Sequence, residues 1–190
     1  NEHGSHSIRG EREERAMRGI YIRSTTLSDL GASVELATED SHLRAYLVKG
    51  EIRSSNASKK GSDRKPRFIE ISVFDTGPGM ALHWLRQRKD LTTLSDLAID
   101  EEFDAVNSCF QKHATTKASQ YFGQGLTTAL GAMKDLKAFM TIRTGRLSLC
   151  QNFSRGDTSE FKPAHRHSHM RQLSEIAGTG YTIGFKVEGR

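Results

Sequence analysis

An acidic residue followed by closely spaced glycines is the first feature of the sequence that could bind a ligand. The motif Asp75-Thr76-Gly77-Pro78-Gly79 comes directly after a β-branched and aromatic run that is typical of a strand. A strand in this place holds the Asp75 carboxylate at the mouth of a sheet, and Gly77 and Gly79 let a ligand approach the backbone without side-chain interference. A carboxylate here also suits a metal site or a turn cap, so the segment alone leaves three interpretations open.

A second glycine pair precedes a helical pattern further along the chain. The residues Gly123-Gln124-Gly125-Leu126 stand where that pattern begins. The free amides and the positive end of the dipole at a helix start favour an anion, so this turn is a candidate phosphate site. The alternative is an ordinary glycine-rich turn, because a lone G-x-G is common.

A third glycine motif, three histidines and two cysteines complete the candidate chemistry. Gly178-Thr179-Gly180 leads into the last strand and offers a hydroxyl beside permissive backbone. The histidines at positions 165, 167 and 169 alternate like a transition-metal clip, but neighbouring basic residues and the lack of a nearby cysteine favour a solvated loop. Cys109 and Cys150 lack the spacing of a metal knuckle, and we interpret them as buried free thiols of a cytoplasmic protein.

Strand and helix patterns predict the elements that position these motifs. Strands are expected at residues 19–26, 42–49, 67–75, 137–143, 146–153 and 179–187. A helix is expected at 80–89, and one or two further short helices are expected to carry Leu94, Leu97, Ala98, Phe103, Val106 and Phe110. A last helix is expected after Gly123, and its residues facing a sheet are Leu126, Leu130, Met133 and Leu136. Residues 154–174 are expected to be an irregular insertion. This order predicts an α+β two-layer sandwich with helices on one face.

Length and composition indicate one globular domain over residues 1–190. The chain is 35% hydrophobic and 27% charged, and no apolar run approaches the roughly 20 residues that cross a bilayer. The net charge of +5 suits a polyanion, but the excess lies mainly in two segments, 9–18 and 53–67, that are typical of solvated loops. Nucleic-acid binding is disfavoured, since an aromatic share of 7% offers few stacking platforms.

The motifs occur in the order of a known ATPase domain. An acid–glycine turn, a glycine-opened helix, a β-hairpin and a Gly-Thr strand together resemble the GHKL (Bergerat-fold) domain of gyrase, heat-shock chaperones, histidine kinases and mismatch-repair proteins. The resemblance covers residues 68–187. It implies a two-layer α/β sandwich of the Bergerat type, a mixed sheet covered on one face by helices, a mobile ATP lid, and the cofactors ATP and Mg²⁺.

The resemblance also implies a role for each glycine motif. In that family the acid after the central strand accepts a hydrogen bond from the adenine amino group, a role that falls to Asp75. The first glycine pair approaches the nucleotide, the second lies at the phosphates, and a hydroxyl on the last strand supports the acid. The implied ATP-binding residues are Asp75, Gly77, Gly79, Gly123, Gly125, Leu126 and Thr179.

Two further parts of the family pattern concern the lid and the metal. Residues 80–122 correspond to the lid. The candidate phosphate contacts within it are His113, Thr115, Thr116 and Lys117. The alternative is that these four residues belong to a solvated loop. The family places an earlier helix whose Glu and Asn hold the attacking water and Mg²⁺. Here Asn1-Glu2-His3-Gly4 resembles the end of that helix, so part of it is expected to be missing and Asn1 is the candidate metal ligand.

The expected function is an ATP-binding domain that acts as a Mg-dependent ATPase or as an ATP-driven conformational switch. One alternative is a histidine-kinase catalytic domain, which would need a dimerising acceptor domain. The other is a non-catalytic, nucleotide-sensing interaction module, which the incomplete helix favours. The expected partners are ATP and an unknown protein or additional domain.

Overall fold

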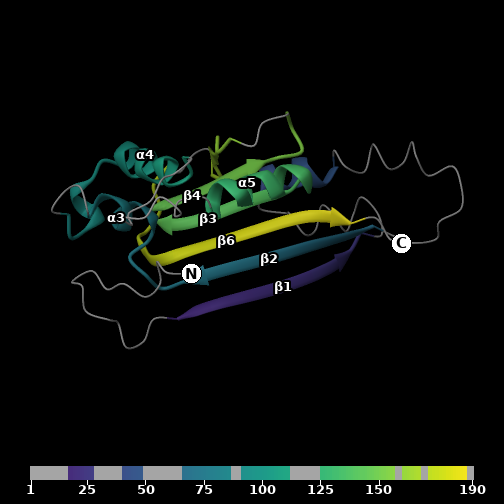
Figure 1. The fold of residues 1–190 in the computed structure, drawn as a ribbon, viewed down its shortest axis with the longest axis horizontal. Coiled ribbons are helices and arrows are strands. Elements are labelled where there is room, and N and C mark those ends of the chain that lie inside the picture. The colour runs from purple at the N-terminus through teal and green to yellow at the C-terminus, as the bar shows by residue number, and fades with distance from the viewer. Residues whose placement is uncertain are drawn as a thin grey trace, which may run out of the picture.

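A six-stranded sheet organises the chain in the computed structural model (Figure 1). The structure describes residues 17–27, 40–48, 66–86, 91–111, 125–156, 160–167 and 171–187. The strands are β1 (Arg18–Thr26), β2 (Arg67–Asp75), β3 (Phe139–Gly145), β4 (Leu147–Asn152), β5 (Ala164–His165) and β6 (Ile176–Val187). Their order in the sheet is β1-β2-β6-β3-β4-β5. The expected strands at 19–26, 67–75, 137–143, 146–153 and 179–187 are therefore confirmed within a few residues.

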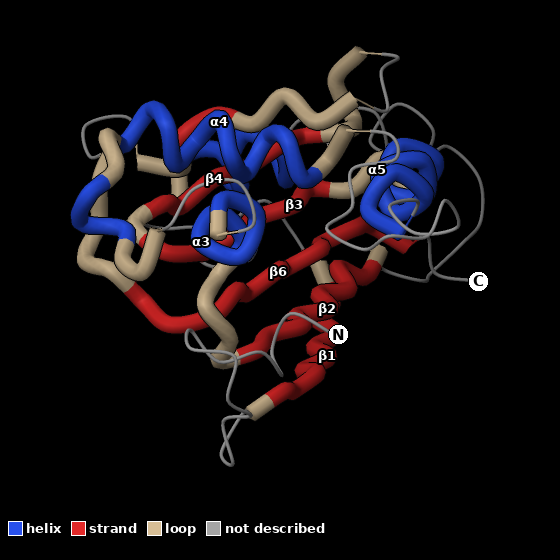
Figure 2. Tube along the Cα trace, turned by 60° about the vertical axis from the view of Figure 1, so that its left-hand side comes forward, coloured by secondary structure: helices blue, strands red, loops and turns tan. Residues whose placement is uncertain are grey.

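The helices between β2 and β3 cover one face of this sheet (Figure 2). They are α3 (Met80–Leu85), the 3₁₀ helix η2 (Leu94–Asp96), α4 (Ile99–Cys109) and α5 (Gly125–Asp135). Leu130 and Met133 of α5 pack into one core with Met140 and Ile142 of β3. Leu136 was expected on the same face but is 47% exposed, because α5 ends at Asp135 and Leu136 lies in the turn that follows.

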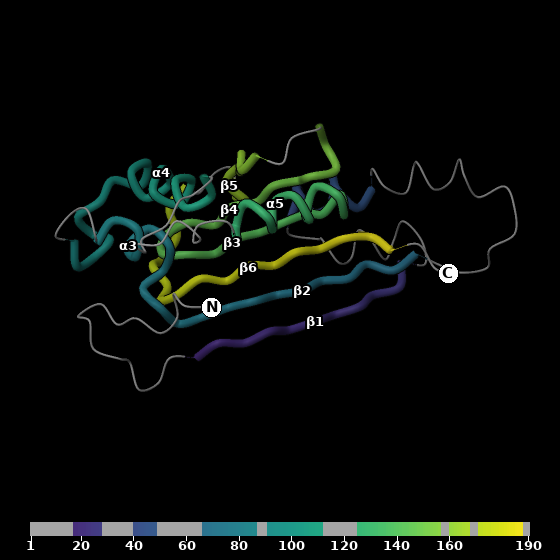
Figure 3. Tube along the Cα trace, viewed as in Figure 1, coloured from purple at the N-terminus to yellow at the C-terminus, as the bar shows by residue number. Residues whose placement is uncertain are grey.

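The sheet is antiparallel throughout, so the prediction of a mixed sheet was wrong. The reason is the position of β6. The helical segment joins β2 to β3, which run in the same direction, but the last strand of the chain inserts between them and pairs with both (Figure 3). As a result, β2 and β3 finish at the same end of the sheet without touching.

A further helix occupies residues 41–48, where a strand was predicted. Asp40 caps it, since the Asp40 Oδ1 atom accepts hydrogen bonds from the backbone nitrogens of His42 and Leu43, both at 3.0 Å. Tyr46 and Leu47 are buried one turn later in a second core with Phe68 and Phe139. Those two phenylalanines point away from α5, so helices lie on both faces of the sheet and not on one.

Strand β1 forms one edge of the sheet and is only partly covered. Its Ile20 and Ile22 lie opposite Val73 and Ile71 of β2, on the same face as Asp75. They are 70% and 65% exposed. Within the described ranges, no helix is long and apolar enough to cross a membrane.

Candidate functional site

Asp75 is the last residue of β2 and is buried, with 6% of its surface exposed. Its Oδ1 atom accepts a hydrogen bond of 2.9 Å from the backbone nitrogen of Gly77, which closes a short turn after the strand. Its Oδ2 atom accepts no hydrogen bond from a described residue. The carboxylate is thus fixed by one oxygen, and the other can receive a hydrogen bond from a ligand.

Sheet register places two threonines beside Asp75 on the helical face. Thr179 of β6 pairs with Asp75 on one side and with Thr144 of β3 on the other. The two threonine hydroxyls lie 3.1 Å apart, so Thr179 bonds to Thr144 and not to the carboxylate. Thr144 also accepts a hydrogen bond of 3.0 Å from the backbone nitrogen of Met80, which ties the start of α3 to the sheet. A buried row of one acid and two hydroxyls therefore crosses three strands.

Two glycines are required by the backbone around this row. Gly79 has φ +82°, and a Cβ atom there would lie 3.1 Å from the Thr144 hydroxyl. Gly178 has φ +85°, and a Cβ atom there would lie 1.8 Å from the carbonyl oxygen of Asp75. These contacts exclude a side chain at Gly178 and strain one at Gly79, because L-residues rarely adopt such φ values. Neither position can change without disturbing the backbone that holds Asp75.

Tyr181 and Met80 form the apolar side of the site. The Tyr181 hydroxyl donates a hydrogen bond of 3.0 Å to the Met80 sulfur. Burial raises the pKa of Tyr181 far above its ordinary value, and the nearby Cys109 thiol and Asp75 carboxylate raise it further. Tyr181 is therefore a neutral, fixed group next to the acid, suited to packing and not to proton transfer.

The start of α5 points toward the same end of the sheet. A short turn at Leu136 and Lys137 joins the end of α5 to the start of β3 (Figure 3). Since β3 ends where β2 ends, the Gly125 end of α5 lies toward the Asp75 end of the sheet. Among the described residues, a Cβ atom at Gly125 would meet nothing within 4 Å, so this part of the chain leaves the space over the helix start open. Leu126 is half-buried against the main core.

The other predicted contacts lie outside the described residues. This holds for Gly123, for the candidate phosphate contacts and for the candidate metal ligand. Their roles stay predictions, and the residues concerned are Gly123, His113, Thr115, Thr116, Lys117 and Asn1.

Most of the segment predicted as a lid is part of the main core. Leu82 of α3 and Val106 of α4 are 2% and 0% exposed. Glu102 of α4 is fully buried, and its two oxygens accept hydrogen bonds from the backbone nitrogen and the Nε atom of Arg146, at 2.8 and 2.7 Å. The assumption that residues 80–122 have few apolar anchors was wrong for α3 and α4. Residues 112–124 lie outside the described residues, and a lid role there stays a prediction.

The histidine and cysteine candidates do not form a metal site in the described part of the chain. No group of three or more metal-ligating side chains occurs among the residues that the structure describes. His165 stacks on Phe103 with ring centres 5.3 Å apart, and burial together with the charge of Arg171 lowers its pKa. Neither Cys109 nor Cys150 forms a disulfide with a described residue, and Cys150 is buried as predicted, whereas Cys109 is only partly buried. His169 lies outside the described ranges.

Sequence reasoning missed Thr144 and Tyr181. The expected strands at 137–143 and 146–153 leave Thr144 in the connection between them, although it is 1% exposed and bonds to two other elements. Its position one residue before a glycine, at the end of an apolar strand, was the available signal. Comparisons of the chain with protein-family models, with curated proteins and with solved structures found no match in any of the three.

Proposed function

We propose that this chain is an ATP-binding domain in which Asp75 recognises the adenine amino group. The observation that carries the proposal is the buried Asp75 carboxylate, held through Oδ1 by Gly77 and open at Oδ2. A charged acceptor with one oxygen left for a ligand suits an exocyclic amino group, because such a charge-assisted hydrogen bond is strong and directional. The open helix start at Gly125, at the same end of the sheet, would face the phosphates.

The proposed activity is an ATP-driven conformational switch, with Mg²⁺ bridging the phosphates. Hydrolysis needs a carboxylate that is free to activate water. The buried acids of the described ranges are Asp40, Asp75 and Glu102. Asp40 caps a helix on the other face, and Glu102 is bound to Arg146. Of these three buried acids, none is therefore free to act as the catalytic base of an ATPase.

Isothermal titration calorimetry with ATP, with and without Mg²⁺, tests the proposal. Asp75→Asn keeps the shape of the side chain and the acceptor for Gly77 but removes the charge. We expect it to weaken ATP binding by more than tenfold, or about 1.5–3 kcal/mol. The matched control is Asp104→Asn on the exposed side of α4, which should bind ATP normally. Unchanged affinity in a folded Asp75→Asn variant would remove the adenine assignment.

A second variant tests the phosphate end of the site. The new side chain of Gly125→Val would meet no described neighbour, but its branched shape would stand between the helix amides and a phosphate. We expect a larger loss of affinity for ATP than for adenosine, measured by the same titration. Equal losses for the two ligands would indicate a general change of the pocket. A phosphate-release assay on the same samples separates a switch from an ATPase.

A further inference from the structure

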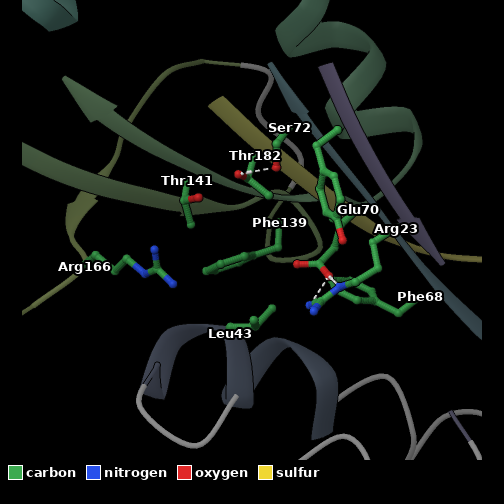
Figure 4. Close-up of a pocket in the computed structure, with 11 residues that line it drawn as sticks. Arg23, Leu43, Phe68, Glu70, Ser72, Phe139, Thr141, Arg166 and Thr182 are labelled. Carbon is green, nitrogen blue, oxygen red and sulfur yellow. Dashed lines mark hydrogen bonds and ion pairs between the residues drawn. The ribbon is translucent and has the colours of Figure 1, made fainter. Parts of the chain in front are cut away.

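A cavity of about 220 Å³ lies on the face of the sheet that faces away from α5 (Figure 4). Its floor is formed by β1, β2, β6 and β3, and the helix at residues 41–48 supplies Leu43 to its wall. Phe139 stands in the middle of the lining in Figure 4, with Arg166 on one side of it and Glu70 and Arg23 on the other. Asp75 points to the opposite face of the same sheet, so this cavity is separate from the candidate nucleotide site.

The Glu70 end of the cavity offers a hydrogen-bond acceptor. Arg23 binds a single oxygen of this carboxylate, with its Nε atom donating to Oε2 at 2.6 Å. Oε1 receives no hydrogen bond from a described residue. The Glu70 side chain is only 15% exposed, so most of it is removed from bulk water. An ammonium or amino group is the partner that such an oxygen favours.

The Arg166 end offers the complementary donors. The Nε atom of Arg166 donates to the Oδ2 atom of Asp40 at 2.6 Å, and its backbone nitrogen donates to the carbonyl oxygen of Ser148 at 2.9 Å. The first contact holds the side chain and the second fixes the backbone that carries it. Its two terminal nitrogens donate to no described residue, and they present the planar fork that binds carboxylates.

Charge balance favours a ligand with no net charge. Arg23 is paired with Glu70, and Arg166 is paired with Asp40, so the cavity has no excess of either sign. A phosphate or another multiply charged anion would leave negative charge uncompensated, at a high cost in a partly buried place. A zwitterion satisfies both ends at once.

The middle and the size of the cavity limit the ligand further. Phe68 and Phe139 are buried and form an apolar wall of the cavity. Thr141 lines the cavity from the sheet, as do Ser72 and Thr182, whose hydroxyls are hydrogen-bonded to each other. The volume equals that of about seven water molecules at roughly 30 Å³ each. It therefore admits a molecule with on the order of ten non-hydrogen atoms.

We propose that this cavity binds a small amino-acid zwitterion with an apolar carbon chain. Arg166 binds the carboxylate, Glu70 binds the ammonium group, and the carbon chain lies on Phe139. The two charges of such a ligand can sit on one carbon or at opposite ends of the chain. Two isomeric probes, L-norvaline and 5-aminopentanoate, distinguish these arrangements.

The test is titration of the intact chain with each probe, followed by NMR chemical shifts and by calorimetry. We expect one isomer to bind with shifts centred on Phe139 and Thr141, and pentanoate and pentylamine to bind at least tenfold more weakly. Glu70→Gln should weaken binding of the preferred isomer at least tenfold and should not weaken binding of pentanoate, since Arg23 keeps its positive charge. Arg166→Gln should weaken binding of the preferred isomer and of pentanoate, and it should not weaken binding of pentylamine.

Two controls keep the result interpretable. Thr141→Leu fills the cavity from the sheet and should abolish binding in a folded protein, even if the charge variants prove unstable. Asp75→Asn acts on the other face and should leave binding of both isomers unchanged. If neither isomer binds at millimolar concentration, or if the preferred one binds equally to the Thr141→Leu variant, the proposal is overturned.

Discussion

Replacing Glu102 by glutamine tests whether α4 belongs to the core or opens as part of a lid. Glu102 lies within the segment that the family resemblance makes a lid, yet it is fully buried and bound to Arg146 in the turn between β3 and β4. If α4 and the sheet unfold together, the loss of this pair must appear in the stability of the whole domain. If α4 opens by itself, only local stability changes.

The magnitude follows from the contacts of the pair. Removing one partner of a buried ion pair costs about 3–5 kcal/mol. Glutamine keeps an oxygen for the backbone nitrogen of Arg146, which restores about 1 kcal/mol. The guanidinium group, 11% exposed, keeps the Leu97 carbonyl as an acceptor but loses its counter-charge. We therefore expect Glu102→Gln to lower the free energy of unfolding by about 3 kcal/mol.

Urea denaturation followed by circular dichroism measures this loss. Asp104→Asn, on the exposed side of the same helix, is the matched control and should cause no measurable change. Hydrogen exchange on both variants reports local opening of residues 99–109. If Glu102→Gln leaves the midpoint of unfolding unchanged and speeds exchange only in α4, then α4 opens independently and our placement of it in the core is refuted.

Two further predictions concern a glycine and a thiol. Gly178→Ala places a Cβ atom 1.8 Å from the Asp75 carbonyl at φ +85° and should cost about 3 kcal/mol or more. Gly131→Ala lies inside α5, where a Cβ atom would meet no described atom within 4 Å, and it should instead stabilise the domain by about 0.5–1 kcal/mol. Thermal unfolding compares the two variants, and similar effects on stability would contradict the structure. Burial, with the charge of Asp40, raises the pKa of Cys150 from 9.0 to about 11. Because the unfolded chain gives up the thiol proton at lower pH than the folded one, the free energy of unfolding falls as pH rises through this window. This loss should amount to about 2–3 kcal/mol between pH 9 and 11, and it should be absent from the Cys150→Ala variant. An unchanged alkaline slope in urea titrations would mean that another group titrates there.

The strands were predictable where residue type decides the conformation. The run from Arg67 to Asp75 is β-branched and aromatic, and it ends at a glycine turn, so local signals agree. The helix at residues 41–48 was missed because its short apolar pattern also fits a strand, and the deciding contact is the cap from Asp40. The antiparallel pairing was not predictable from local pattern, because it depends on a C-terminal strand inserting between two earlier ones.

The same division applies to the two candidate sites. The Asp75 turn is contiguous in sequence, so its carboxylate and glycines were visible as a motif. Thr144 acquires its role only through register with Thr179, 35 residues later in the chain. The cavity at Glu70 and Arg166 combines side chains from distant segments, none of which forms a motif alone. Motifs that are local in sequence were visible in advance, and groups of residues that the sheet brings together were not.

The exposed edge at β1 has a consequence for handling the protein. The strand is nine residues long, and no described segment pairs with its outer edge. Unpaired backbone groups beside Ile20, Tyr21 and Ile22 form a template on which a second strand can add, which is a common start of aggregation. Arg18 and Arg23 flank this apolar stretch as charged gatekeepers. Because salt screens their repulsion between copies, high ionic strength is expected to favour self-association of the purified domain.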